Sequence, residues 1–156
     1  MDMSARCLVL ACGNTLRSDD GVGPRLAEWA AERFREDSNV RVVARQQWTP
    51  DLAAEIAAAE SVLFVDSSVD SAPGRVSLIP VEAKTNGSAS AAHQLGAPEL
   101  LGLSRTLYGA QSANAMLLTV GAGSTELGES FSERVEAALP RASGVLEKAV
   151  LRFLED

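Results

Sequence analysis

The sequence predicts a three-layer α/β/α single domain with a mainly parallel central sheet of about five strands. Short apolar runs alternate along the chain with longer stretches of helical spacing, which is the pattern of strands connected by helices. The first run, residues 6–12, has no polar alternation, as is typical of a parallel strand covered on both faces. The 156 residues, 46% hydrophobic and 22% charged, fit one globular domain spanning residues 1–156.

The first half of the chain predicts three strands and two helices. Residues 6–12 are expected to form a central strand because they are continuously apolar. Apolar residues then recur at helical spacing from Val22 to Phe34, and either Asp19 or Asp20 is the expected N-cap of this helix. A strand near a sheet edge, a short helix and a third strand follow, expected at residues 39–45, 52–59 and 61–66.

The second half predicts two further strands and two helices. Residues 82–93 are rich in Ser, Ala, Gly and Asn and show no periodicity, so we expect a mobile loop there. Pro140 lies inside the last apolar pattern and predicts a kink or a break into two pieces. The strands are expected at residues 75–81 and 114–122, and the helices at 98–108 and 131–153.

Charge and composition narrow the function classes. The net charge of -7 and the absence of a Lys/Arg cluster make nucleic acid an unlikely partner. No stretch approaches the ~20 apolar residues of a membrane span, and the short apolar run near the N-terminus reads directly into an acidic turn, unlike a signal peptide. We therefore expect a soluble, cytoplasmic protein.

The two cysteines lie five residues apart in the first strand, so they point to opposite faces and cannot form a disulfide. Cys7 and Cys12 are expected to be reduced and to pack as small hydrophobic residues. A thiolate role for Cys12 is the alternative.

Three side chains stand out for chemistry: Asp20 after the first strand, Asp66 at the end of the third, and His93 after the fourth. Loops at the carboxyl ends of the strands meet at one edge of an open α/β sheet, where ligands gather. Two carboxylates and an imidazole could hold a divalent metal such as zinc, nickel or manganese. Spacing alone is also compatible with no shared site: His93 would then be an exposed histidine, and Asp20 and Asp66 would cap a helix or a turn.

Other active-site patterns are missing. The first turn, residues 11–16, lacks the glycine spacing of a dinucleotide loop, and no serine lies in a Gly-x-Ser-x-Gly elbow. The single histidine does not support a conventional zinc protease.

Three segments together carry a family resemblance: residues 8–23, 65–74 and 93–95. The helix at 98–108 and the ending at 139–142 extend the likeness over almost the whole chain. By these segments the chain resembles the hydrogenase maturation endopeptidases.

The resemblance implies removal of the C-terminal extension of a NiFe-hydrogenase large-subunit precursor after nickel insertion. By position in the family motif, Asp20, Asp66 and His93 are the implied catalytic and metal-binding residues. Nickel is expected to arrive with the precursor, so the isolated protein would be metal-free or bind another divalent ion. A monomer is expected.

The resemblance leaves the mechanism open. The metal could polarise the scissile carbonyl or lower the pKa of a bound water, or it could act as a template while Asp19 or Asp66 serves as base. Two departures stand out: Ala11 replaces a usual glycine, and residues 121–124 replace a Gly-Ile-Glu-Pro-like segment. The alternatives are a non-catalytic nickel-sensing chaperone for the precursor, and a small-molecule hydrolase or binding protein on the same fold.

Overall fold

The computed structural model describes residues 5–84, 95–109 and 114–155. One five-stranded sheet forms the centre, in the order β2-β1-β3-β5-β4. Four of the strands run parallel to their neighbours, and β4 pairs with β5 in the antiparallel direction at one edge. The strands are β1 (Ala5–Cys12), β2 (Val40–Arg45), β3 (Ala59–Ser68), β4 (Val76–Pro80) and β5 (Asn114–Gly121).

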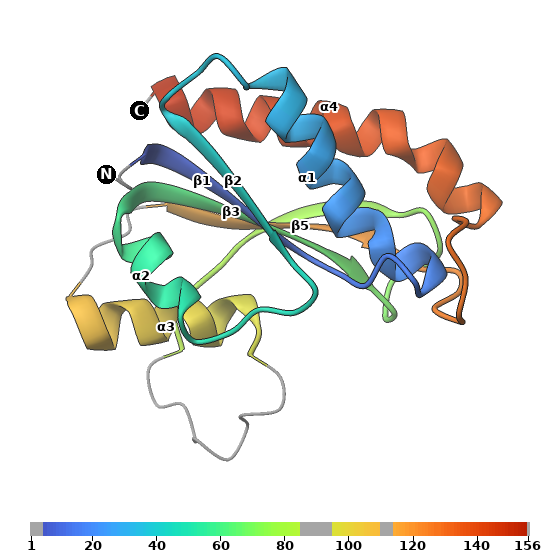
Figure 1. The fold of residues 1–156 in the computed structure, drawn as a ribbon, viewed down its shortest axis with the longest axis horizontal. Coiled ribbons are helices and arrows are strands. Elements are labelled where there is room, and N and C mark those ends of the chain that lie inside the picture. The colour runs from blue at the N-terminus through green and yellow to red at the C-terminus, as the bar shows by residue number, and fades with distance from the viewer. Residues whose placement is uncertain (1–4, 85–94, 110–113, 156) are drawn as a thin grey trace.

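Helices cover both faces of this sheet, which confirms the predicted three-layer architecture (Figure 1). One face is covered by α1 (Val22–Arg33) and α4 (Glu133–Glu155), and the other by α2 (Leu52–Ala57) and α3 (Ala97–Tyr108). No helix of the described part of the chain is long and apolar enough to cross a membrane.

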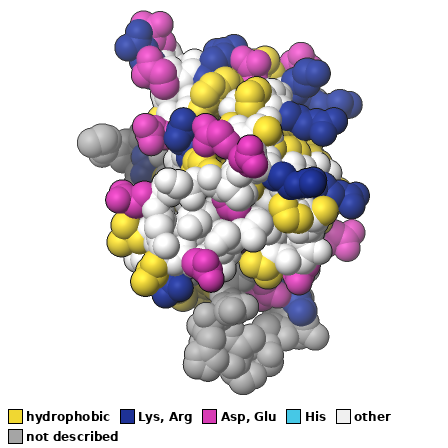
Figure 2. All heavy atoms as spheres, turned by 90° about the vertical axis from the view of Figure 1, so that its right-hand side faces the viewer, with side chains coloured by type: hydrophobic (Ala, Val, Ile, Leu, Met, Phe, Trp, Pro, Cys, Tyr) yellow, Lys and Arg dark blue, Asp and Glu magenta, His cyan; other side chains and the backbone are white. Residues whose placement is uncertain are grey.

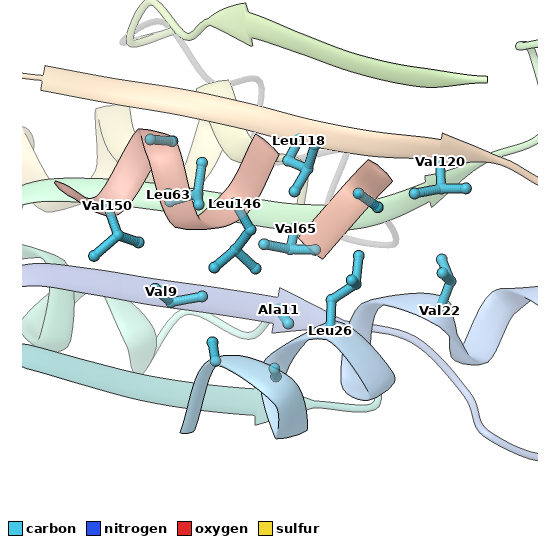
Figure 3. Close-up of a cluster of buried hydrophobic side chains, with 14 of the residues drawn as sticks. Val9, Ala11, Val22, Leu26, Leu63, Val65, Leu118, Val120, Leu146 and Val150 are labelled. Carbon is cyan, nitrogen blue, oxygen red and sulfur yellow. The ribbon is translucent and has the colours of Figure 1, made fainter. Parts of the chain in front are cut away.

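The apolar run of β1 is continuous because its side chains enter two separate cores. Cys7, Val9 and Ala11 pack toward α1 and α4, whereas the side chains between them pack toward α2 and α3. In Figure 3, Val9 and Ala11 of β1 lie opposite Leu146 and Val150 of α4 and Leu26 of α1. A polar residue at either set of positions would be buried without a partner, so no alternation is possible.

Both cysteines are free and buried, on opposite faces of β1 as predicted. Ala11 is fully buried in the core beneath α1, so the departure from glycine at this position places a methyl group in that core.

Of the kink or break predicted at Pro140, the break is wrong, because α4 continues through Pro140 as one 23-residue helix. Proline removes one backbone hydrogen bond from a helix. The buried side chains of α4 lie on both sides of Pro140, including Val135, Ala142 and Leu146, and their packing in the core holds both halves of the helix against the sheet.

The strand order defines where a ligand can bind. From β1 the chain crosses to β2 on one side and then to β3 on the other side. The crevice outside the carboxyl ends of β1 and β3 is therefore the topological switch point, the usual ligand position in an open α/β sheet.

Candidate functional site

Two of the three predicted site residues lie at this switch point. Asp20 belongs to a single 3₁₀ turn, η1 (Ser18–Gly21), which follows β1. Asp66 is the third residue from the end of β3 and pairs with Thr119 of β5. Figure 2 looks onto this edge of the sheet, where charged side chains of both signs surround a largely uncharged centre. Asp20 and Asp66 lie near enough for the charge of Asp20 to act on the Asp66 carboxyl group, and their role as site residues stays a prediction.

His93 lies outside the described residues, so its predicted place in the site stays a prediction. Within residues 5–84, 95–109 and 114–155, no three His, Cys, Asp or Glu side chains come close enough together to hold a metal ion. Carboxylate oxygens are suitable ligands for a divalent metal. Asp20 and Asp66 therefore fit such an ion only as part of a set that further ligands complete.

Both carboxylate oxygens of Asp20 accept hydrogen bonds. The backbone N–H of Asn14 donates to Oδ2 over 2.8 Å, and the hydroxyl of Ser67 donates to Oδ1 over 2.9 Å. The prediction of Asp19 or Asp20 as N-cap of α1 is wrong. The N-cap is Gly21, with no side-chain hydrogen bond, because both carboxylates are held by other segments of the chain.

Gly13 allows the turn that carries Asp20 to fold back against the end of β1. A Cβ atom on Gly13 would lie 2.0 Å from the backbone oxygen of Asp20 and 2.9 Å from Pro24, and φ is +155°. Only glycine fits this approach without a shift of the backbone. The Gly-Asn break that ends the first apolar run is therefore part of the site's construction.

Asp66 is a partly buried carboxyl group with an altered acidity. Burial raises the pKa of Asp66 to about 6, and the charge of Asp20 acts in the same direction. Hydrogen bonds from the backbone N–H of Ser67, at 2.8 Å, and from the thiol of Cys12 oppose the rise. A carboxyl group with a pKa near neutrality can exchange a proton under physiological conditions.

Cys12 lies beside Asp66 on the face of α2 and α3. Burial raises the pKa of the Cys12 thiol well above its usual range, and the negative charge of Asp66 raises it further. The thiol is therefore protonated at neutral pH, which argues against a thiolate role. It acts as a hydrogen-bond donor to Asp66.

Asp19 is fully buried, and its carboxylate joins the turn after β1 to the segment between β5 and α4. It accepts hydrogen bonds from the backbone N–H groups of Gly123, Ser124 and Ser132 and from the Ser132 hydroxyl, at 2.7–3.0 Å. Burial alone would raise the pKa of Asp19, but these bonds outweigh it and hold the pKa below its ordinary value. We call this group the Asp19 anchor.

The Asp19 anchor gives residues 121–124 a structural role. The backbone N–H groups of Gly123 and Ser124 bind Asp19, and the Asp19 N–H donates in return to the Ser124 oxygen over 3.0 Å. The departure from the family pattern therefore falls on a segment that supports the turn bearing Asp20. Sequence reasoning missed the partners Ser67 and Ser132, because serine is common and the resemblance assigns no role to either residue.

Two open hollows lie next to the turn that carries Asp20. One, of about 360 Å³, is lined by Arg25, Glu28 and Glu136 among others. The second, of about 370 Å³, lies on the other side and includes Asn14 and Arg45 in its lining. Both hollows are open to solvent, unlike the enclosed apolar pocket that the small-molecule alternative requires.

The fold and site can be compared with solved structures. The hydrogenase 2 maturation peptidase from Thaumarchaeota archaeon SCGC_AB-539-E09 is 28% identical, with a TM-score of 0.67 over 93% of this chain and 97% of that one. The chain is similar to this maturation peptidase in fold over nearly its whole length. The resemblance drawn from the three sequence segments is thereby confirmed.

Further maturation proteases share the fold of this chain. HybD from Thermococcus kodakarensis is 24% identical, with a TM-score of 0.67 over 92% of this chain and 98% of that one. HybD from E. coli is 22% identical, with a TM-score of 0.67 over 94% and 93%. No family model matches the chain, and no curated protein matches it by sequence. The similarity to maturation proteases therefore rests on the three-dimensional fold and on the motif segments.

Proposed function

We propose that this chain is an endopeptidase that removes the C-terminal extension of a NiFe-hydrogenase large-subunit precursor after nickel insertion. One observation carries the proposal: Asp20 and Asp66 meet at the switch point of a chain with the fold of the hydrogenase maturation proteases. The precursor and its nickel are the substrate in this proposal. The cytoplasmic location and the monomeric state stay predictions.

The three site residues have distinct tasks in the proposed reaction. Asp20, Asp66 and His93 would contact the nickel that the precursor carries, and nickel supplies Lewis acidity toward a carbonyl or a bound water. Asp20 is already fixed by Asn14 and Ser67, so it offers oriented oxygens without reorganisation. Contact with all three residues would orient the precursor for cleavage.

The choice of base between Asp19 and Asp66 favours Asp66. Asp19 is fully buried and its oxygens are occupied by four hydrogen bonds, so it has no path to a substrate proton. Asp66 is partly exposed at the edge of the sheet, so its carboxylate can reach a substrate proton. We therefore assign to Asp66 the acceptance of a proton during peptide hydrolysis.

The proposal is tested by the mass of a nickel-loaded large-subunit precursor before and after incubation with the purified full chain. The wild-type chain should shorten the precursor, and Asp20→Asn, Asp66→Asn and His93→Ala should each leave the extension attached. Asp70→Asn, which changes an exposed carboxylate, is the control and should cleave normally.

Two outcomes would contradict this proposal in different ways. An unchanged precursor mass with the folded wild-type chain would reject the endopeptidase. Normal cleavage by all three site variants would reject the assigned site and leave the activity in place.

A non-catalytic chaperone is the second candidate, suggested by the altered segment at residues 121–124. This segment binds Asp19 through its backbone N–H groups. A change of side chains in the segment therefore does not by itself favour loss of activity. A stable complex with the nickel-loaded precursor, with the precursor mass unchanged, would be the result expected of a chaperone.

A further inference from the structure

Ser67 makes a hydrogen bond to each of the two carboxylates of the site. Its backbone N–H donates to Asp66 Oδ1 over 2.8 Å, and its hydroxyl donates to Asp20 Oδ1 over 2.9 Å. We infer that Ser67 is a positioning residue that fixes the Asp20 carboxylate relative to Asp66. The inference rests on the proposed function and adds a residue that neither the motif nor the spacing assigns.

The pleat of β3 explains how one residue reaches both carboxylates. Side chains alternate along the strand, with Val65 in the core beneath α1 and α4 and Phe64 in the core beneath α2 and α3. The Ser67 hydroxyl therefore leaves the strand on the side of Val65, and the Asp66 carboxylate on the opposite side. The hydroxyl meets Asp20 of η1, 47 residues earlier in the chain.

The two donors on Asp20 come from separate segments. Asn14 belongs to the turn after β1 and binds Oδ2, so it moves together with the segment that carries Asp20. Ser67 belongs to β3, which pairs with β1 and β5 at the centre of the sheet. The hydrogen bond from the Ser67 hydroxyl therefore connects Asp20 to β3, the strand that carries Asp66.

Removing the hydroxyl leaves the Ser67 backbone N–H, and its bond to Asp66, in place. In Ser67→Ala, Asp20 Oδ1 loses its donor from β3 and the carboxylate can rotate about its own turn. Loss of a group that orients a metal-contacting residue typically costs 10–100-fold in activity. We expect kcat/KM on nickel-loaded precursor to fall about 10–100-fold, because Asp20 would be held less firmly toward the nickel of the precursor.

Two variants control for packing and for a general loss of structure. Ser67→Thr keeps the hydroxyl and should retain kcat/KM within about 3-fold of wild type. Ser68→Ala removes a neighbouring hydroxyl that contacts Ser71 and Asp70 and should leave kcat/KM unchanged. If Ser67→Thr is also slow, the cause is the space around residue 67, and the role of the hydroxyl is overturned. A wild-type kcat/KM in Ser67→Ala would overturn it as well.

A second measurement does not depend on proteolysis. The Asn14 N–H is bonded to Asp20 Oδ2, so its hydrogen-exchange rate reports how firmly Asp20 is held. We expect Ser67→Ala to speed this exchange about 10-fold, and Ser68→Ala to leave it unchanged. Unchanged exchange in Ser67→Ala would overturn the inference.

The two readouts separate the inference from the proposed function. If the wild-type chain fails to cleave the precursor, the endopeptidase is rejected, and the exchange rate of Asn14 still decides whether Ser67 holds Asp20.

Discussion

Asp19 and the Asp20–Asp66 pair are neighbouring acidic regions with opposite physical characters. The Asp19 carboxylate is fully buried, but four hydrogen bonds stabilise its charge and lower its pKa. Asp66 retains some exposure, yet burial dominates its hydrogen bonds and raises its pKa to about 6. Hydrogen-bond donors stabilise the charge of a carboxylate, and Asp19 has four of them on its two oxygens.

This difference separates structural from chemical roles. The Asp19 anchor holds the turn after β1 against the segment before α4, and its carboxylate has no further capacity for a substrate. Asp66 has an acidity suited to proton exchange, which is the character expected of an active-site group. Comparing substitutions in the two regions tests this division.

The largest expected effect is on stability, in Asp19→Ala. Four donors would lose their acceptor in a buried place, and we expect the free energy of unfolding to fall by about 3–5 kcal/mol. Urea denaturation at pH 7 measures this change. Asp70→Ala, at an exposed carboxylate, is the control and should change it by less than about 0.5 kcal/mol.

The Asp19 effect should also depend on pH. Because folding lowers the pKa of Asp19 from an ordinary value of 3.8, its stabilisation is complete above that value and is lost as the pH falls through the lower folded pKa. The gap between wild type and Asp19→Ala should therefore narrow in acid. Equal free energies of unfolding for wild type and Asp19→Ala at pH 7 would contradict the stabilising role of the Asp19 anchor.

A smaller loss of stability is expected from Gly13→Ala. Gly13 packs against the backbone of Asp20, which lies between the Asp19 anchor and Asp66. The new Cβ would lie 2.0 Å from the Asp20 oxygen, so the turn must move, at a cost of about 2–3 kcal/mol. Cleavage should fall as well, because Asp20 moves with the turn. Thermal unfolding and the precursor assay measure the two effects.

Gly144→Ala is the matched control for Gly13→Ala. Gly144 lies in α4, and its added Cβ would meet no atom within 4 Å. Alanine should stabilise this helix by about 0.5–1 kcal/mol. Similar effects at the two glycines would show that the close approach at Gly13 has no importance.

The smallest expected change is a gain in stability from Asp66→Asn. Above pH 6 the wild-type carboxylate is charged in a partly buried place, and the amide removes that charge, which should raise the free energy of unfolding by on the order of 1 kcal/mol at pH 8. The difference should disappear as the pH falls through about 6 toward 3.8, because the folded wild type then takes up its proton. Urea denaturation at pH 8, 6 and 4 measures it.

A destabilised Asp66→Asn at pH 8 would contradict the division between the two regions, since Asp66 would then serve stability as Asp19 does. If Asp66→Asn is more stable than wild type but leaves the precursor uncut, the Asp66 carboxylate lowers stability and is needed for cleavage.

The sequence predicted the layers, the central place of β1 and the site edge because these follow from short-range patterns. Continuous apolar runs at β1 and β3 indicate strands buried on both faces, and the polar residues that end them indicate the ligand-binding edge. The break predicted at Pro140 failed because a local rule about proline was weighed without the packing of α4 on the sheet.

The sequence by itself determined that Asp19, Asp20 and Asp66 lie at the carboxyl ends of buried strands. Only the tertiary structure decided what each carboxylate does. The partners of Asp19 are 104 to 113 residues away and the hydroxyl on Asp20 is 47 residues away. Periodicity reports neighbours a few residues apart, whereas the donors that set a carboxylate's charge come together only when the chain folds.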